Sequence, residues 1–291
     1  MDVSIIIVNY NTLELTKNCI ESIIVNTSIV KYEIILVDNA SNDGSKEYFE
    51  SRKDILYIYN NENVGFGRAN NIGIRKSSGK YIFLLNSDTY LRNNAIYLFF
   101  EYMENTDKNI AVVGTYLKDK ALNTNTSEVH FLKIKTILTN SIKAFVPKRK
   151  GIACKQNNKN EEKDVEAVIG ADMFIRRNVI DECGMFDERI FMYCEEIDLQ
   201  KRITDSGYKI RLILGPDIVH LEGSSSNRYS AKRNIMFTNG VFYYIKKHNP
   251  YWKYLIFRFL FFTLKSPIVF SNRYSLHDRL SIMANNMRMI N

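Results

Sequence analysis

The sequence predicts an α/β fold built on a mostly parallel, doubly wound sheet. Short runs rich in β-branched residues alternate with segments of helical apolar spacing, and several of the runs end abruptly on polar residues. Repeated strand and helix units of this kind form a parallel sheet that helices cover on both faces. Such sheets bind their ligands beyond the carboxyl ends of the strands.

The first unit is a strand over residues 3–8 followed by a helix. Asn11 and Thr12 are suited to capping that helix, and apolar residues from Leu13 to Ile24 recur at helical spacing. The same alternation predicts strands at 34–37, 55–59, 81–85 and 111–113, and helices at 46–52, 68–77 and 95–104.

Residues 118–163 lose the periodicity and are rich in Lys, Asn and Thr, so we expect a long variable excursion there. The pattern then returns with strands at 165–169, 173–175 and 210–214 and a helix at 196–205 that Gly207 closes. We therefore expect a catalytic domain over residues 1–230 and a C-terminal basic helical extension over 231–291.

Charge is distributed unevenly along the chain. The net charge is +8, but residues 231–291 alone carry ten Lys or Arg and the single acid Asp278. A basic region confined to one end favours contact with an anionic surface and argues against a nucleic-acid-binding body. The four cysteines form no C-x-x-C pair, and no apolar leader follows a basic start. We expect a cytoplasmic protein with ordinary thiols.

Residues 251–264 form the apolar part of this extension. They are aromatic and basic, and Arg258 interrupts an apolar stretch far shorter than the roughly 20 residues that span a bilayer. A helix lying in the interface on the inner face of the cell membrane, with Trp252 at headgroup depth, is one interpretation. A packing helix or a homodimer contact is the other.

Polar residues end three of the predicted strands. Asn9 and Tyr10 follow the first, Asp38 follows the second, and Asn86-Ser87-Asp88 follows a buried run. Three such changes at one edge of a sheet suggest a ligand site. Asp88 is placed to hold a hard divalent cation that bridges two phosphates, although a turn aspartate that bonds its own backbone is an equal alternative.

A glycine-spaced loop lies between these strand ends. Gly65 and Gly67 begin a G-x-G-x-x pattern, but its sixth position is Asn70 and the loop follows the third strand. A Rossmann dehydrogenase is therefore disfavoured. The sequence also has no G-x-x-x-x-G-K motif, which argues against a P-loop ATPase.

Three acids gather at the start of a predicted helix: Glu195, Glu196 and Asp198. Acids are common there because they complement the helix dipole. Adjacent carboxylates also raise each other's pKa, which suits a general base near neutral pH. His220 ends a short strand further on, and a structural role and metal ligation remain equal alternatives for it.

Taken together, these segments resemble family 2 glycosyltransferases of the GT-A fold, and within them the rhamnosyltransferase-like group. The resemblance covers about residues 3–230 and fades in 118–163 and in the tail. The strings that carry it are Ser4-Ile-Ile-Ile-Val-Asn-Tyr-Asn11, Val37-Asp-Asn-Ala-Ser-Asn-Asp-Gly44, Asn63-Val-Gly-Phe66, Leu84-Leu-Asn-Ser-Asp88, Gly184-Met-Phe-Asp187 and Glu195-Glu-Ile-Asp198.

The resemblance implies a role for each matching position. The base and ribose of a nucleotide-diphosphate sugar would contact Asp38 and Tyr10, and Arg68 would lie near the diphosphate. Asp88 would bind Mg²⁺ or Mn²⁺ as the second acid of a D-x-D motif that has Asn86 at its first position, and His220 is the further candidate ligand. The remaining residues expected around the donor are Val8, Asn9, Asn63, Gly65, Asn71 and Ser87.

The acceptor side would include Asp172, Asp187 and Asp198. Glu196 occupies the place of the family's catalytic aspartate, and Glu195 is the candidate to share its role. The implied reaction is one in-line displacement that inverts the anomeric carbon, with rhamnose as a candidate sugar and a lipid-linked or polysaccharide acceptor in cell-surface glycan synthesis.

Two other functions fit parts of the pattern. A sugar-nucleotide pyrophosphorylase would need a glycine-rich loop bearing Arg and Lys after the first strand, where this chain has Asn9-Tyr10-Asn11-Thr12. A non-catalytic glycan-binding or scaffold protein with the same fold stays open, and hydrolysis of the donor would separate it from an enzyme.

Overall fold

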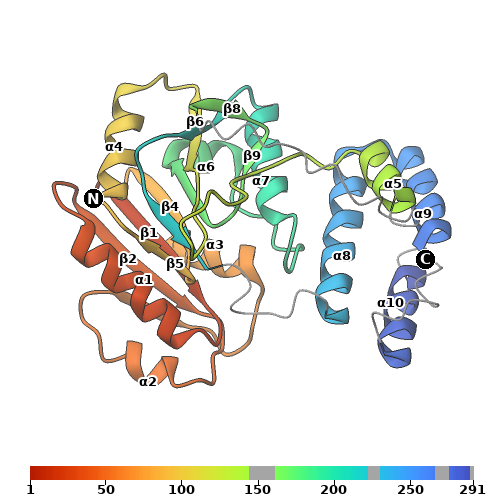
Figure 1. Ribbon diagram of the computed structural model, residues 1–291, viewed down its shortest axis with the longest axis horizontal. Helices are drawn as coiled ribbons and strands as arrows, with labels where there is room; N and C mark the ends of the chain where they lie inside the picture. Colours follow the sequence, from red (N-terminus) through yellow and green to blue (C-terminus); the bar gives the residue numbers. More distant parts are fainter. Residues whose placement is uncertain (144–160, 222–229, 266–274, 289–291) are drawn as a thin grey trace. The chain divides into compact units, whose positions relative to one another are not determined.

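A computed structural model describes residues 1–143, 161–221, 230–265 and 275–288 (Figure 1). Residues 144–160 of the predicted excursion, and residues 266–274 and 289–291 of the predicted extension, lie outside this part. The chain folds into two compact units. The first comprises the described residues of Met1–Phe131, Asn160–Phe191 and Glu195–Ser225, and the second those of Leu132–Lys159, Met192–Cys194 and Ser226–Asn291.

An eight-stranded sheet forms the centre of the first unit, in the order β3-β2-β1-β4-β10-β6-β11-β8. Its strands are β1 (Val3–Asn9), β2 (Tyr32–Asp38), β3 (Leu56–Tyr59), β4 (Tyr81–Asn86), β6 (Ile110–Thr115), β8 (Lys163–Val165), β10 (Asp172–Arg176) and β11 (Lys209–Ile213). The strands β10 and β8 run antiparallel to their neighbours, and the other six are parallel to one another. The predicted, mostly parallel sheet is confirmed.

Helices cover both faces of this sheet. Alternation along β1 sends Ile5 and Ile7 to one face and Ile6 to the other. The first face packs against α1 (Leu13–Asn26), α2 (Ser45–Phe49) and α4 (Ala95–Asn105), and the second against α3 (Phe66–Lys76), α6 (Arg177–Cys183) and α7 (Glu195–Asp205). The sheet is therefore doubly wound, as predicted.

Two short pairs of strands complete the first unit. β5 (Thr89–Leu91) pairs with β12 (Ile218–His220), and the register places His220 opposite Thr89. β7 (Glu128–Val129) pairs with β9 (Ala167–Val168). The pairing of β5 with β12 matters for the site because it returns a distant segment to the end of β4.

The second unit is helical in its described part. It contains α5 (Ile134–Lys143), α8 (Ala231–His248), α9 (Tyr251–Lys265) and α10 (Leu276–Arg288). Helix α9 packs on α5 and α8, and α10 packs on α8. The helical character of the C-terminal extension is confirmed, whereas no helix was predicted at α5, within residues 118–163. In the described part of the chain no helix is both long and apolar enough to cross a membrane.

Candidate functional site

Asn9 joins the end of β1 to the end of β2. Its amide nitrogen donates to Asp38 Oδ2 at 3.0 Å and to Ser41 Oγ at 3.1 Å. Its amide oxygen accepts hydrogen bonds from the hydroxyls of Thr12 and Thr16 at the start of α1, at 2.7 and 3.0 Å. Asn9 is fully buried, so the side chain fixes the geometry of the strand ends from inside.

Asp38 is buried at the centre of the same network. One carboxylate oxygen accepts the Ser41 backbone N–H at 2.8 Å, and the other accepts from Asn9 and from the Tyr57 hydroxyl at 3.2 Å. Burial raises the pKa of Tyr57, and the Asp38 charge adds to the effect. Tyr10, the next expected base contact, is half exposed beyond the strand end.

Asn39, which follows Asp38 at the polar end of β2, organises the glycine loop. Its amide donates to Asn63 Oδ1 at 2.8 Å, and its oxygen accepts the Val64 backbone N–H at 3.1 Å. Gly65 follows with a φ of +89°, and a Cβ at that position would overlap the carbonyl of Phe191. Two features therefore require glycine at this position: its left-handed backbone conformation and the close approach of the Phe191 carbonyl.

Asn71 and Arg68, on α3, both face the segment after α6. Asn71 is buried, and its side chain donates to the Phe186 carbonyl at 2.9 Å and accepts the Phe186 N–H at 3.0 Å. Arg68 is half exposed and pairs with Glu188 at 3.2 Å, as Arg75 does at 3.1 Å. In this structure both expected donor-binding residues hold the 186–188 segment, and Glu188 is the partner that the sequence analysis missed.

Asp88 and His220 meet beyond the carboxyl end of β4. Asp88 Oδ1 lies 3.2 Å from His220 Nε2, and both side chains are nearly buried. The pairing of β12 with β5 brings them together although they are far apart in the sequence. Asn86 Nδ2 lies 3.5 Å from the same imidazole nitrogen, and Ser87 Oγ lies 3.1 Å from the Thr12 hydroxyl, which links this group to the Asn9 network.

This pair offers two ligand atoms that suit a divalent cation, one carboxylate oxygen and one imidazole nitrogen. Within the residues that the structure describes, His220 Nδ1 is buried without a hydrogen-bond partner, so Asp88 is the group that faces the ring nitrogens, at Nε2. Among the residues that the structure describes, no group of three His, Cys, Asp or Glu is arranged to hold a metal. A cation here would take its remaining ligands from substrate oxygens and water.

The acids at the start of α7 have an environment of a different kind. Glu195 is buried and Glu196 partly buried, and one carboxylate oxygen of each is buried with no hydrogen-bond partner among the described residues. Burial raises the pKa of Glu195 well above its usual range, with a further contribution from the Glu196 charge. Burial also raises the pKa of Glu196, and two backbone N–H groups partly offset that rise. Glu195 lies against Gly67 and Glu196 against Gly170.

The residues expected on the acceptor side have separate surroundings. Asp198 accepts from Arg202 at 3.1 Å, and the same guanidinium donates to the Met185 carbonyl at 2.6 Å, so the pair secures the turn after α6. Asp187 is bound by Arg189 through two hydrogen bonds at 2.8 and 2.9 Å. Asp172 is fully buried and accepts the Thr115 N–H at 2.7 Å, while its Oδ1 has no hydrogen-bond partner in the part of the chain that the structure describes.

Asp172 owes its place to the antiparallel strand. Because β10 runs against β4, its first residue lies opposite Leu85, at the carboxyl end of β4. Burial raises the pKa of Asp172 well above the ordinary value, and the Thr115 N–H offsets only part of the rise. Val8 is likewise set by the sheet, opposite Asn86 in the register of β1 with β4.

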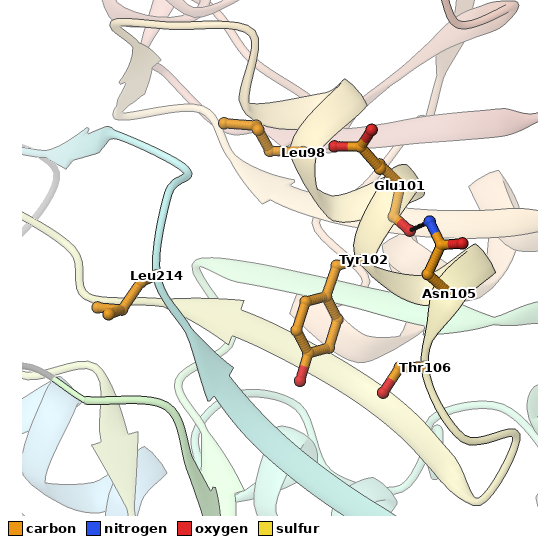
Figure 2. A pocket seen from close by; sticks show the side chains of 6 residues that line it. All are labelled: Leu98, Glu101, Tyr102, Asn105, Thr106 and Leu214. Carbon is orange, nitrogen blue, oxygen red and sulfur yellow. Dashed lines mark hydrogen bonds between the residues drawn. The ribbon is translucent and has the colours of Figure 1, made fainter.

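A pocket of about 350 Å³ lies elsewhere in the first unit (Figure 2). Its lining comes from one side of α4 and from Leu214, just after β11, and includes the Tyr102 ring and Glu101. None of the predicted site residues lines it. The strand ends and the start of α7 therefore carry the chemistry that this unit offers.

The segment before Glu195 is shaped within the second unit. Tyr193 and Cys194 both have left-handed backbone conformations, with φ of 70° and 73°. Gly240 of α8 packs directly on the Tyr193 carbonyl, where a Cβ would overlap the oxygen, and the Tyr193 ring contacts Phe237. Left-handed conformations are costly for residues with a side chain, so this packing holds a strained segment in place.

Comparisons with known proteins identify the family of the chain. A family model described as glycosyl transferase family 2 matches residues 4–184. The chain is similar to Low-salt glycan biosynthesis hexosyltransferase Agl10 of Haloferax volcanii, at 27% identity over 80% of this chain and 72% of that protein. It is also similar to Rhamnosyltransferase WbbL of Escherichia coli K12, at 23% identity over 79% of this chain and 87% of that protein.

A solved structure shares the fold. The structure of GalNAc-T7 with UDP, GalNAc and Mn²⁺ superposes with a TM-score of 0.63 at 15% identity, over 99% of this chain and 54% of that one. The chain thus spans about half the length of that neighbour. The likeness confirms the GT-A type of α/β fold.

Proposed function

The chain belongs to glycosyl transferase family 2 and takes part in glycan biosynthesis, and on that premise we propose that it is a metal-dependent, inverting enzyme. Its donor would be a nucleotide-diphosphate sugar, with rhamnose as the candidate sugar. Its acceptor would be a hydroxyl of a lipid-linked or polysaccharide glycan at the inner face of the cell membrane. The observation that carries the proposal is the nearly buried pair of Asp88 and His220 beyond β4.

The first unit supplies a donor site at the strand ends. The network around Asn9 and Asp38 presents a fixed surface beside the half-exposed Tyr10, as a base and ribose pocket requires. Asp88 and His220 would hold Mg²⁺ or Mn²⁺ next to it. When bound there, the cation would neutralise the charge that develops on the diphosphate leaving group.

Glu196 removes the proton of the acceptor hydroxyl in this proposal. The hydroxyl oxygen then forms its bond to the anomeric carbon as the bond from that carbon to the diphosphate oxygen breaks, which inverts the configuration. A carboxylate with a raised pKa is a stronger base near neutral pH, and burial gives Glu196 this property. Glu195, whose own pKa is raised by burial and by the Glu196 charge, shares the role as the adjacent carboxyl.

The remaining assignments follow the same plan. Arg68 would exchange Glu188 for the diphosphate when donor binds, which its half-exposed position allows. Asn63, Gly65, Asn71, Asn86 and Ser87 would shape the donor side, and Asp172, Asp187 and Asp198 the acceptor side.

The test is titration calorimetry of nucleoside diphosphates with and without Mn²⁺. We expect Asp88→Ala to weaken the Mn²⁺-dependent part of nucleotide binding at least tenfold and to leave the metal-free binding unchanged. Asp107→Ala, which removes an exposed acid just after α4, is the matched control. Unchanged affinity in Asp88→Ala would remove this residue from the metal site.

A second measurement separates an enzyme from a non-catalytic glycan-binding protein. Donor hydrolysis is followed without acceptor in the presence of Mn²⁺. Slow release of nucleoside diphosphate by the native chain, lost in Asp88→Ala, supports turnover. Tight nucleotide binding with no release, and no transfer to any glycan offered, would favour the binding protein.

A further inference from the structure

Helix α9 is apolar on two opposite faces, and the described residues of the second unit cover one of them. Tyr254, Phe257 and Phe261 form the inner face and are buried. The ring of Phe242, on α8, lies 5.2 Å from the Phe257 ring and 5.0 Å from the Phe261 ring. Aromatic packing of this kind accounts for the stability of the inner face.

The outer face of α9 carries large apolar side chains in the open. Phe259 is 69% exposed and Trp252 is 59% exposed, although both residue types are usually covered. The full set is Tyr251, Trp252, Leu255, Ile256, Phe259 and Leu260. At 100° per residue they span one half of the helix, opposite the buried set. A contiguous apolar face of this size marks a binding surface.

The basic residues near α9 and the length of this helix indicate which kind of partner covers its outer face. Lys246 and Lys247 end α8, Lys253 lies at the start of α9, and residues 231–291 contain ten Lys or Arg and one acid. A 15-residue helix is about 22 Å long, shorter than the roughly 30 Å hydrocarbon core of a bilayer. Such a helix lies in an interface with its apolar face in the acyl region and its bases among the headgroups.

We propose that the outer face of α9 binds the interface of an anionic lipid bilayer. A second copy of the chain is the competing occupant, but pairing the same face across a two-fold axis would bring two sets of bases together. Anionic headgroups instead neutralise them, which favours binding to an anionic surface. Trp252 and Tyr251 begin the helix, and both residue types favour the level of the headgroups.

Trp252 makes the test direct because it is the only tryptophan of the chain. Full-length protein is mixed with phosphatidylcholine vesicles that contain increasing fractions of phosphatidylglycerol. We expect the emission of Trp252 to shift to shorter wavelength and to be quenched by lipids brominated on the acyl chains. Binding should increase with the anionic fraction and weaken, without vanishing, as salt screens the charges.

The key variant keeps Trp252, the fluorescent reporter, and removes two other apolar side chains from the outer face of α9. Ile256→Ser with Phe259→Ser should lower the partition coefficient at least tenfold, and both sites are exposed, so the fold is kept. Ile24→Ser with Val25→Ser on α1 is the matched control, since it removes two exposed apolar residues outside the second unit. Nucleotide affinity, measured in parallel, is expected to stay unchanged in both, so failure here is distinct from failure of the donor site.

Three results would overturn the proposal. The first is an unshifted, unquenched Trp252 at every lipid composition. The second is equal binding by the α9 variant and the native chain. The third is a concentration-dependent dimer in sedimentation that the α9 variant dissolves while vesicles are ignored, which would assign this face to a second copy.

Discussion

The amide network at the ends of β1 and β2 and the acids at the start of α7 belong to one unit, but they are built in opposite ways. In the network, the side chains of Asn9, Asp38 and Asn39 are satisfied by hydrogen bonds. Their partners are each other, nearby side chains and backbone N–H groups. At α7 and at the start of β10, Glu195, Glu196 and Asp172 each have a buried oxygen that no described residue hydrogen-bonds. The first region is fixed by its own hydrogen bonds, and the second holds carboxyls whose pKa values are raised by burial.

This difference has a physical reason. A buried polar group without a partner costs about 1–3 kcal/mol, so a fold keeps such groups only where something else requires them. Satisfied amides give a rigid surface for recognition, whereas an unsatisfied, desolvated carboxyl has the raised pKa that proton transfer needs. The following predictions test whether the two regions divide recognition from proton transfer in this way.

The largest effect is expected at Glu196. Glu196→Gln should lower kcat by about 10²–10⁴, the range for loss of a general base, while nucleotide affinity is kept. Glu195→Gln should lower kcat less, because in the proposal Glu195 acts only as the neighbour of Glu196. Steady-state transfer and calorimetry on each variant check this. Near-normal turnover in Glu196→Gln together with collapse in Glu195→Gln would move the base to Glu195.

The second effect concerns the rigidity of the recognition region. In Gly65→Ala, alanine must adopt the left-handed conformation and its Cβ would clash with the Phe191 carbonyl. We therefore expect a loss of roughly 2–5 kcal/mol of unfolding free energy. Gly207→Ala is the matched control, because Gly207 has a φ of +91° but open space around it. It should lose only about 1–2 kcal/mol. Equal losses in urea denaturation would show that the close approach at Gly65 contributes nothing.

The third effect tests how the acids are positioned. Gly240→Ala places a methyl group against the Tyr193 carbonyl, two residues before Glu195. Alanine favours the helix by about 1 kcal/mol, which offsets only part of the cost of this overlap, so we expect a net loss of roughly 1–4 kcal/mol of unfolding free energy. Displacement of the Tyr193–Cys194 segment should also lower kcat about ten- to a hundredfold with nucleotide affinity kept. An unchanged kcat would contradict any influence of α8 on the base.

Much of the fold could be predicted from the sequence because local patterns determine its elements. The predicted strand over 3–8 and helix over 95–104 match β1 and α4 within one residue at each end. The reversed direction of β10 was not predicted, since an apolar strand core reads the same in both directions. Helix α5 was missed because its apolar residues occur within a polar, Lys-rich region.

The candidate site was predictable where motifs are short and local. The strand-end residues Asn9, Asp38 and Asp88 were singled out from the change of apolar to polar residues. His220 was also singled out, as a candidate metal ligand beside Asp88, whereas the hydrogen bond from Asn71 to the Phe186 carbonyl, across a long stretch of sequence, was not predicted. Long-range pairs of this kind depend on topology, and no local pattern encodes them.

The last prediction concerns how the free energy of unfolding depends on pH, which tests whether the buried carboxyl of Asp172 holds a proton. Burial raises the pKa of Asp172 above its ordinary value of 3.8, so between about pH 4 and that raised pKa the folded chain keeps a proton that the unfolded chain releases. Stability therefore falls as pH rises through this window, by up to about 1.4 kcal/mol per pH unit for one proton. Asp172→Asn cannot ionise and keeps the oxygen that accepts the Thr115 N–H, so the variant should become progressively more stable than the native chain from pH 4 to pH 7.

Asp54→Asn is the control of opposite sign. Hydrogen bonds from Arg52 lower the pKa of Asp54, and the stability that the ionised carboxylate contributes is fully present above about pH 4. That variant should show a small, constant deficit across the same range. Urea denaturation of the three proteins at half-unit steps of pH makes the comparison, and a constant offset for Asp172→Asn would mean that the buried carboxyl holds no extra proton.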